Sequence, residues 1–305
     1  MQLLQKLRDS SFIESVVKEI EEAEIRAREY SNNILNFLTQ SSGNIITYSY
    51  TGYGYTPASL MYWYSLTFQS TKFPLLLEAE ESSIYLLPYR DDIAIIIYST
   101  GEYSKLIQTI QVARVLNVDY IAFTPEPRQE QIKSALKYYG VEILSRRDDE
   151  KVETVIELTL ASFFAISELL RNQIPARGSR LFTHGKEGFS LIAQSLYEKY
   201  VGVLESILKH NELFVTSTKF LEASSILLAY SLRQIGIEAR YIPLNEALDI
   251  ETPVLALMLS TDDRAQKEIR HLRSLPLLEL VLNVDPLEAM VYIAILAFFL
   301  SRLTR

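Results

Sequence analysis

Two short loops rich in hydroxyl groups and glycine carry the clearest candidate chemistry in this sequence. The segment 98–104, Tyr-Ser-Thr-Gly-Glu-Tyr-Ser, lies between an apolar run and a helical stretch. A helix that begins there presents unpaired N–H groups and the positive end of its dipole, which suits a phosphate group. The groups that would complete this site are Ser99, Thr100, Gly101 and Ser104. The alternative is a plain helix cap formed by Ser99 or Thr100.

The second loop, 49–57, reads Ser-Tyr-Thr-Gly-Tyr-Gly-Tyr-Thr-Pro and follows another apolar run. Its candidate ligand groups are the hydroxyl of Thr51 and the backbone at Gly52. The alternative is a Tyr-rich surface turn in which Thr56 caps a helix and Pro57 occupies its first turn. Two glycines match neither a dinucleotide fingerprint nor a lysine-bearing phosphate loop, so no nucleotide cofactor is expected.

Both loops must be positioned by the alternating apolar and helical segments around them. Nearly continuous apolar runs separated by helices predict an α/β fold with parallel sheets covered on both faces. The expected strands are 44–50, 73–79, 92–98, 118–124 and 141–144, then 212–216, 238–242, 253–259 and 277–284. The expected helices are 12–38, 56–70, 102–116, 128–139, 149–172, 189–210, 220–235, 263–272 and 286–302. Ligands of such sheets bind beyond the carboxyl ends of strands, where both loops fall.

The length of 305 residues is about twice that of a typical domain. Pro175 and the glycine-containing segment 176–179 follow a long helical stretch, and we place the domain boundary there. The predicted organisation is an N-terminal helical segment 1–43, a first domain 44–175 and a second domain 176–305.

The run from Ile93 to Thr124 resembles a sugar isomerase (SIS) domain, in which an apolar strand runs into Ser-x-Ser-Gly-Glu-Thr and a helix. Thr100, Gly101 and Glu102 fall on the second Ser, the Gly and the Glu of that pattern. The segments 75–80 and 238–246 are similar to further pieces of a double-SIS chain. The whole resembles the isomerase half of glucosamine-6-phosphate synthase and archaeal phosphoglucose/phosphomannose isomerases.

The resemblance implies two tandem flavodoxin-like, SIS-type sheets sandwiched by helices, with a phosphorylated sugar or amino sugar as ligand. It also implies a homodimer. Active members move a carbonyl between C1 and C2, which requires a base and an acid that helps to open the sugar ring. Here Glu246 is the candidate base and His184, in an expected interdomain loop at 183–188, is the candidate acid. Glu80 is a further substrate-binding candidate.

The departures from the pattern leave three functions open. Tyr98 and Tyr103 replace the first Ser and the Thr, and the Lys and His of the synthase's second half have no counterpart. The chain is therefore a phosphosugar isomerase, a sugar-phosphate sensor or partner subunit without catalysis, or a structural protein. The contact surface of a structural protein would be the aromatic residues Tyr53, Tyr55, Tyr62, Trp63 and Tyr64.

Composition excludes several classes of protein. A net charge of −8 without a basic stripe argues against a nucleic-acid binder. The absence of cysteine removes disulfides and thiolate chemistry and suits a reducing cytoplasm. The most apolar run, 289–303, is shorter than the roughly 20 residues that span a bilayer, so no membrane segment is expected. No spacing of His, Asp and Glu indicates a metal site.

Overall fold

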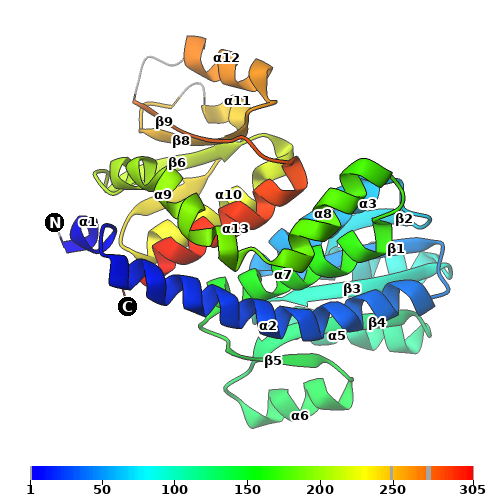
Figure 1. Ribbon diagram of the computed structural model, residues 1–305. Coiled ribbons are helices and arrows are strands. Elements are labelled where there is room, and N and C mark those ends of the chain that lie inside the picture. The colour runs from blue at the N-terminus through cyan, green and yellow to red at the C-terminus, as the bar shows by residue number, and fades with distance from the viewer. Residues whose placement is uncertain (1, 248–249, 273–275, 305) are drawn as a thin grey trace. The chain divides into compact units, whose positions relative to one another are not determined.

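The computed structural model describes residues 2–247, 250–272 and 276–304. The chain forms two compact units, one of residues 23–187 and one of residues 1–22 together with 188–305 (Figure 1). Helix α2 (Ser10–Gln40) contributes its first turns to the second of these units and the rest to the first. The units therefore divide between Glu187 and Gly188, twelve residues beyond Pro175.

The unit 23–187 is built on a five-stranded parallel sheet in the order β2-β1-β3-β4-β5. Its strands are β1 (Ile45–Thr51), β2 (Phe73–Glu78), β3 (Ile93–Ser99), β4 (Asp119–Glu126) and β5 (Glu142–Arg147). This is the flavodoxin-like strand order. Every residue of β3 is buried, because the strand has neighbours on both edges and helices on both faces.

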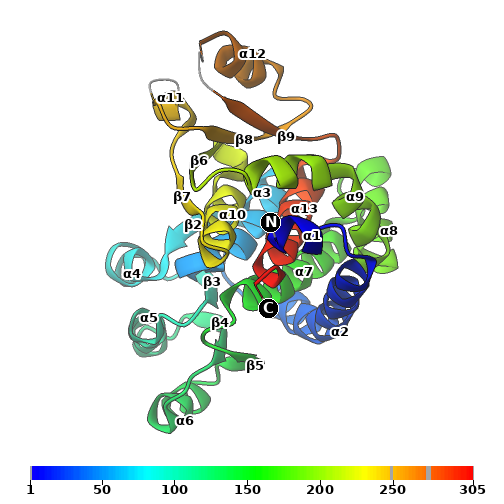
Figure 2. The same cartoon turned by 90° about the vertical axis from the view of Figure 1, so that its left-hand side faces the viewer.

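Helices cover the two faces of this sheet in the pattern that alternate side chains dictate. On one face, Ile95 and Ile97 of β3 pack with Leu106 and Ile110 of α5 (Tyr103–Val115). On the other face, Ser162 of α7 (Lys151–Leu170) donates to the hydroxyl of Tyr98, 2.9 Å away. Helix α3 (Tyr55–Thr67) joins α7 on that face, and α6 (Glu130–Tyr138) lies beside α5, as Figure 2 shows.

Two helical regions of this unit were not expected. Residues 79–89 form three short turns, α4 (Ala79–Glu81), η2 (Ser82–Leu86) and η3 (Leu87–Tyr89). The predicted turn at 176–179 and the interdomain loop at 183–188 are wrong, because one helix, α8, spans Pro175–Glu187. Its glycines serve close packing: an added Cβ would lie 2.4 Å from the Arg171 carbonyl at Gly178 and 3.3 Å from the Phe163 ring at Gly185.

The second unit contains a four-stranded parallel sheet in the order β7-β6-β8-β9. Its strands are β6 (Glu212–Ser217), β7 (Glu238–Tyr241), β8 (Val254–Leu259) and β9 (Leu277–Leu282). Its helical segments are α1 (Gln2–Lys6), α9 (Ser190–Ile207), η4 (Lys219–Leu221), α10 (Glu222–Gln234), α11 (Leu244–Ala247), α12 (Asp263–Leu272) and α13 (Pro286–Arg302). The predicted fold class, two parallel sheets sandwiched by helices, is confirmed.

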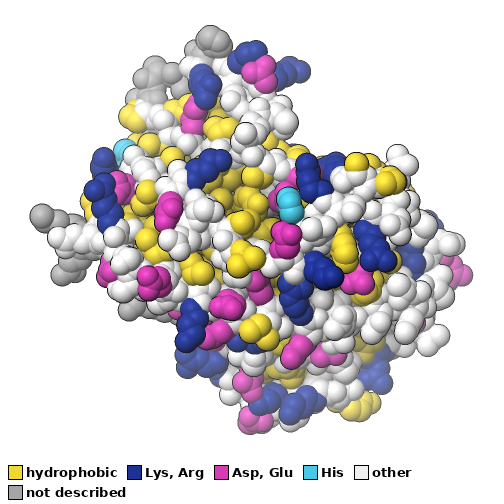
Figure 3. Space-filling model, viewed as in Figure 1, with side chains coloured by type: hydrophobic (Ala, Val, Ile, Leu, Met, Phe, Trp, Pro, Cys, Tyr) yellow, Lys and Arg dark blue, Asp and Glu magenta, His cyan; other side chains and the backbone are white. Residues whose placement is uncertain are grey.

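The distribution of surface charge and the character of the helices can be compared with the expectations for nucleic-acid binding and membrane insertion. In the face drawn in Figure 3, Lys and Arg side chains are interspersed with Asp and Glu. Helices α7 and α13 are almost entirely buried. Across the described residues, no helix combines the length and apolar character needed to cross a membrane.

Candidate functional site

Both hydroxyl-rich loops lie where the strand order of the first sheet reverses, between β1 and β3. The chain leaves β1 through α3 to reach β2 on one side, and later returns to β3 on the other side of β1. The carboxyl ends of β1 and β3 thus lie at a topological switch point, which is where ligands of such sheets bind. Thr51 and Ser99 are paired in register at the ends of these two strands.

Hydrogen bonds between buried hydroxyls join the two loops. Thr51 Oγ1 donates to Ser99 Oγ over 2.9 Å, and the Gly101 amide donates to the same oxygen over 3.3 Å. The Tyr53 amide donates to Thr100 Oγ1 over 3.0 Å. Ser99 thus accepts two hydrogen bonds, and among the described residues its hydroxyl donates to none. The three hydroxyl residues are at most 1% exposed, so the loops form one rigid structure.

Glycine is required where these loops approach each other. Gly52 and Gly101 have φ angles of +53° and +107°, which residues with a Cβ rarely adopt. An added Cβ at Gly52 would lie 2.8 Å from Thr100 Oγ1 and 3.2 Å from Glu102 Oε1. The carboxylate of Glu102 therefore lies beside the backbone of the first loop.

Helix α5 begins directly after the loop that follows β3. Glu102 precedes the helix, and among the described residues its side chain makes no capping hydrogen bond. As in any α-helix, the first N–H groups of α5 have no hydrogen-bond partner within the helix itself. Ser104, in the first turn, is exposed. This end of the helix can accept an anion through backbone donors.

Three carboxylates surround one ammonium group at this edge of the sheet. Lys105 Nζ lies 2.6 Å from Glu78 Oε1, 3.5 Å from Glu102 Oε2 and 3.8 Å from Glu80 Oε2. The hydrogen bond to Glu78 raises the pKa of Lys105. All four side chains are over a third exposed, so each pair contributes well under about 1 kcal/mol. Glu80 thus belongs to an ion cluster next to the loops.

Sequence reasoning missed several charged residues of this edge. Arg128 Nε donates to Asp148 Oδ1 over 3.0 Å, and an added Cβ at Gly101 would lie 3.6 Å from the Asp148 Cβ. Lys151 Nζ lies 5.8 Å from the centre of the Tyr53 ring. These residues follow β4 and β5, which extend beyond their predicted ends, and no motif marks them.

The two tyrosines that replace family hydroxyls play different parts. Tyr98 is fully buried, accepts the Ser162 hydrogen bond and stacks on Phe123 at a centroid distance of 5.9 Å. Its side chain belongs to the core on the α7 face. Tyr103 is half-buried and donates to the Pro125 carbonyl over 3.4 Å, and burial raises the pKa of its phenol.

The candidate acid and base lie on elements outside these loops. His184 is half-buried on α8, which packs on α7. Glu246 is exposed on α11, in the unit that contains the second sheet. There it contributes, after burial and Glu222, to a rise in the pKa of Tyr241 to about 12. In the part of the chain that the structure describes, no three His, Asp or Glu side chains are grouped to hold a metal.

No protein-family model matches the sequence, and a search of curated proteins finds no match. Solved structures are similar in fold. Glucosamine-6-phosphate deaminase from Thermotoga maritima is similar with a TM-score of 0.64 at 14% identity, over 94% of this chain and 93% of that one. Tagatose-6-phosphate ketose/aldose isomerase from Escherichia coli is similar with a TM-score of 0.62 at 12% identity, over 96% of this chain and 93% of that one.

The C-terminal domain of glucosamine-fructose-6-phosphate aminotransferase from Francisella tularensis is also similar. Its TM-score is 0.62 at 12% identity, over 97% of each chain. These likenesses confirm the double-SIS fold that the sequence resemblance predicted. At such low identities they bear on the fold and not on the chemistry.

Proposed function

We propose that this protein binds a phosphorylated sugar or amino sugar at the loops that follow β1 and β3. One observation carries the proposal. The hydroxyls of Thr51 and Ser99 are bonded to each other, and that of Thr100 is bonded to the backbone of the first loop, at the carboxyl ends of paired strands beside the N-terminus of α5. Neutral hydroxyls and backbone N–H groups in this arrangement bind phosphate without a dedicated cation. The three similar structures named above are described as proteins of phosphorylated sugars.

The reaction that we propose is aldose–ketose isomerisation. A base takes the proton from one carbon and returns it to the next, while an acid protonates the ring oxygen during opening. We assign the base to Glu246, as the resemblance implies, and the acid to His184. The sugar phosphate would be held by Thr51, Gly52, Ser99, Thr100, Gly101 and Ser104, with Glu80 at the rim.

A sugar-phosphate sensor without catalysis is the second candidate, and a specific observation favours it. The first serine of the family pattern is replaced by Tyr98, whose side chain is fully buried and belongs to the core. The carboxylates nearest the loops, Glu78 and Glu102, are engaged by Lys105. The pairing with Lys105 reduces the carboxylates available for proton transfer, whereas the hydroxyls of Thr51, Ser99 and Thr100 remain in place.

Ligand-induced stabilisation tests binding. Glucose 6-phosphate, fructose 6-phosphate and glucosamine 6-phosphate are added to the full chain, and the unfolding midpoint is recorded. A ligand present at 100 times its Kd stabilises the folded state by about 2.7 kcal/mol. Thr100→Val should abolish this shift. Thr47→Val is the matched control. Thr47, in β1, is as buried as Thr100, but its hydroxyl has no hydrogen-bond partner among the described residues.

Absence of a shift with any of the three sugars would refute binding. Conversion of fructose 6-phosphate into an aldose, lost in Glu246→Gln, would establish the isomerase. Stabilisation without conversion would establish the sensor. We also infer a homodimer from the family resemblance alone, and sedimentation equilibrium would check it.

A further inference from the structure

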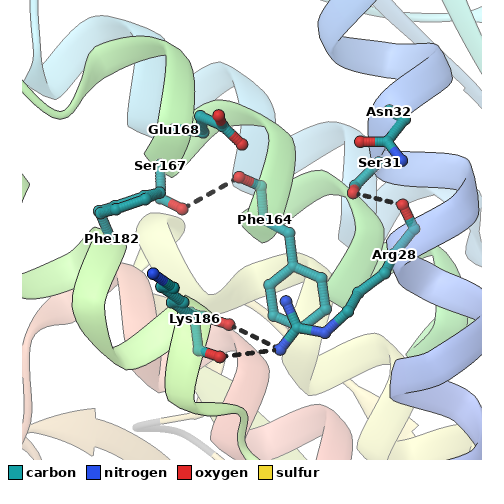
Figure 4. A pocket seen from close by; sticks show the side chains of 9 residues that line it. Arg28, Ser31, Asn32, Phe164, Ser167, Glu168, Phe182 and Lys186 are labelled. Carbon is teal, nitrogen blue, oxygen red and sulfur yellow. Dashed lines mark hydrogen bonds between the residues drawn. The ribbon is translucent and has the colours of Figure 1, made fainter.

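A cavity lies among three helices of the unit 23–187. It has a volume of about 440 Å³ and is walled by α2, α7 and α8 (Figure 4). The same helix α7 begins at Lys151, next to Tyr53 of the first loop, and Phe164 of the cavity lies about 20 Å further along it at 1.5 Å per residue. The cavity is therefore separate from the loops of the proposed sugar-phosphate site.

The guanidinium of Arg28 is fixed at the wall of this cavity. It lies 4.5 Å from the centre of the Phe164 ring. Its Nη2 donates to the carbonyls of Gly185 and Lys186 at 3.2 and 3.1 Å, near the end of α8. Figure 4 shows both bonds and the ring on which the group stacks. Within the described residues, Nε and Nη1 of Arg28 have no partner, so three N–H donors of the planar guanidinium remain available.

The backbone behind this group is also held closely. Gly185 brings α8 against α7, since an added Cβ would lie 3.3 Å from both the Phe163 ring and Ser167 Oγ. Ser31 and Ser167 are buried in the wall and bond to carbonyls of their own helices. The wall therefore does not need a ligand for its own hydrogen bonding.

Three further polar side chains line the cavity without internal partners. The Lys186 ammonium, the Glu168 carboxylate and the Asn32 amide form no ion pair or hydrogen bond with any residue that the structure describes. With Arg28 they give two cations and one anion, in a protein whose net charge is −8. Phe164 and Phe182 supply the apolar wall. Binding pockets combine such a wall with a few convergent polar groups.

We propose that this cavity binds a small organic anion that carries a carboxylate or phosphate group. The remaining N–H groups of Arg28 can donate to an oxygen of either group, and Lys186 adds a mobile positive charge. Glu168 and Asn32 can accept hydrogen bonds from a hydroxyl of the same ligand. The site is an addition to the sugar-phosphate site and does not depend on it.

Titration calorimetry of the full chain with L-malate and with inorganic phosphate tests the proposal and separates its two chemistries. Lys186→Met is the deciding variant, because its ammonium contacts no described residue and its loss should leave the melting temperature unchanged. We expect the affinity for the bound anion to fall roughly tenfold or more, as loss of a charge-assisted contact does. Lys137→Met is the matched control, since Lys137 is exposed on α6.

Unchanged affinity in Lys186→Met would overturn the proposal, as would failure of both anions to bind to the native protein. Thr100→Val separates the two sites. If the anion affinity falls in Thr100→Val and not in Lys186→Met, the anion occupies the loops and this cavity is not its site. If the fall follows Lys186 alone, the cavity is established whatever the outcome at the loops.

Discussion

A Cβ added to Gly54 would lie 2.1 Å from the carbonyl oxygen of Tyr98, so the first hydroxyl loop rests directly on the end of β3. This contact is between backbones, and no side-chain rotation can relieve it. It determines how the donors of the first loop meet those of the second. The proposed phosphate site thus depends on a residue that contributes no ligand group.

Gly54→Ala should destabilise the protein, because the new methyl group forces the two loops apart. Overpacking of this kind costs roughly 1–3 kcal/mol of unfolding free energy. Urea denaturation measures the change. Gly202→Ala provides a control of opposite sign: Gly202 lies in α9 with no atom within 4 Å of an added Cβ, so alanine should stabilise by about 0.5–1 kcal/mol. Equal effects at the two glycines would contradict this reading of the contact.

Glu157→Gln should weaken the packing of α2 and β5 on α7. Glu157 is fully buried, and its Oε1 accepts from Arg26 Nε at 2.6 Å and from Arg146 Nε at 2.8 Å. Loss of the carboxylate leaves two partly buried cations without their counter-charge, which costs about 3–5 kcal/mol. Chemical denaturation should show this loss, whereas the exposed Glu168→Gln should stay within about 0.5 kcal/mol of the wild type. A near-neutral Glu157→Gln would contradict this expectation.

Tyr241 should make the unit with the second sheet sensitive to alkaline pH. Burial, followed by Glu222 and Glu246, raises the pKa of its phenol from 10.0 to about 12. The folded state therefore favours the neutral phenol, so this contribution to stability is complete below pH 10 and disappears as the pH rises through about 12. Denaturation curves between these pH values should fall less steeply for Tyr241→Phe than for the wild type.

The same phenol reports on the candidate base. Glu246→Gln removes one of the negative charges that oppose ionisation of Tyr241, so the phenol should titrate at lower pH, as ultraviolet absorbance would measure. Glu222→Gln should act in the same direction and more strongly, because Glu222 is the larger charge contribution. A Tyr241 titration unchanged in both variants would mean that neither carboxylate lies near it.

Much of the fold could be predicted because the buried strands are continuous apolar runs in the sequence. Every residue of β3 is buried, and its run of isoleucines is the clearest strand signal in the sequence. The hydroxyl loops were found by the same logic, since Ser99 and Thr100 directly follow this run. Helix α8 was missed because Pro175, Gly178 and Gly185 are signals of turns in sequence but here start a helix and allow it to approach α7 closely.

The charged part of the candidate site could not be predicted. Lys105, Arg128 and Lys151 come from three different segments, which follow β3, β4 and β5, and each contacts residues of other segments. Each has the spacing of an ordinary surface residue in its own helix or loop. Their relation depends on the strand order, which places the ends of β3, β4 and β5 side by side. No local pattern encodes that relation.

The position of Tyr98 limits which residues this strand end can hold. Its ring fills the core and accepts the hydrogen bond of Ser162, so Tyr98→Ser would remove a buried aromatic side chain at a cost of about 3–5 kcal/mol. That is a large fraction of the roughly 5–15 kcal/mol by which a domain is stable. A serine at position 98 therefore requires compensating changes in the packing between β3 and α7.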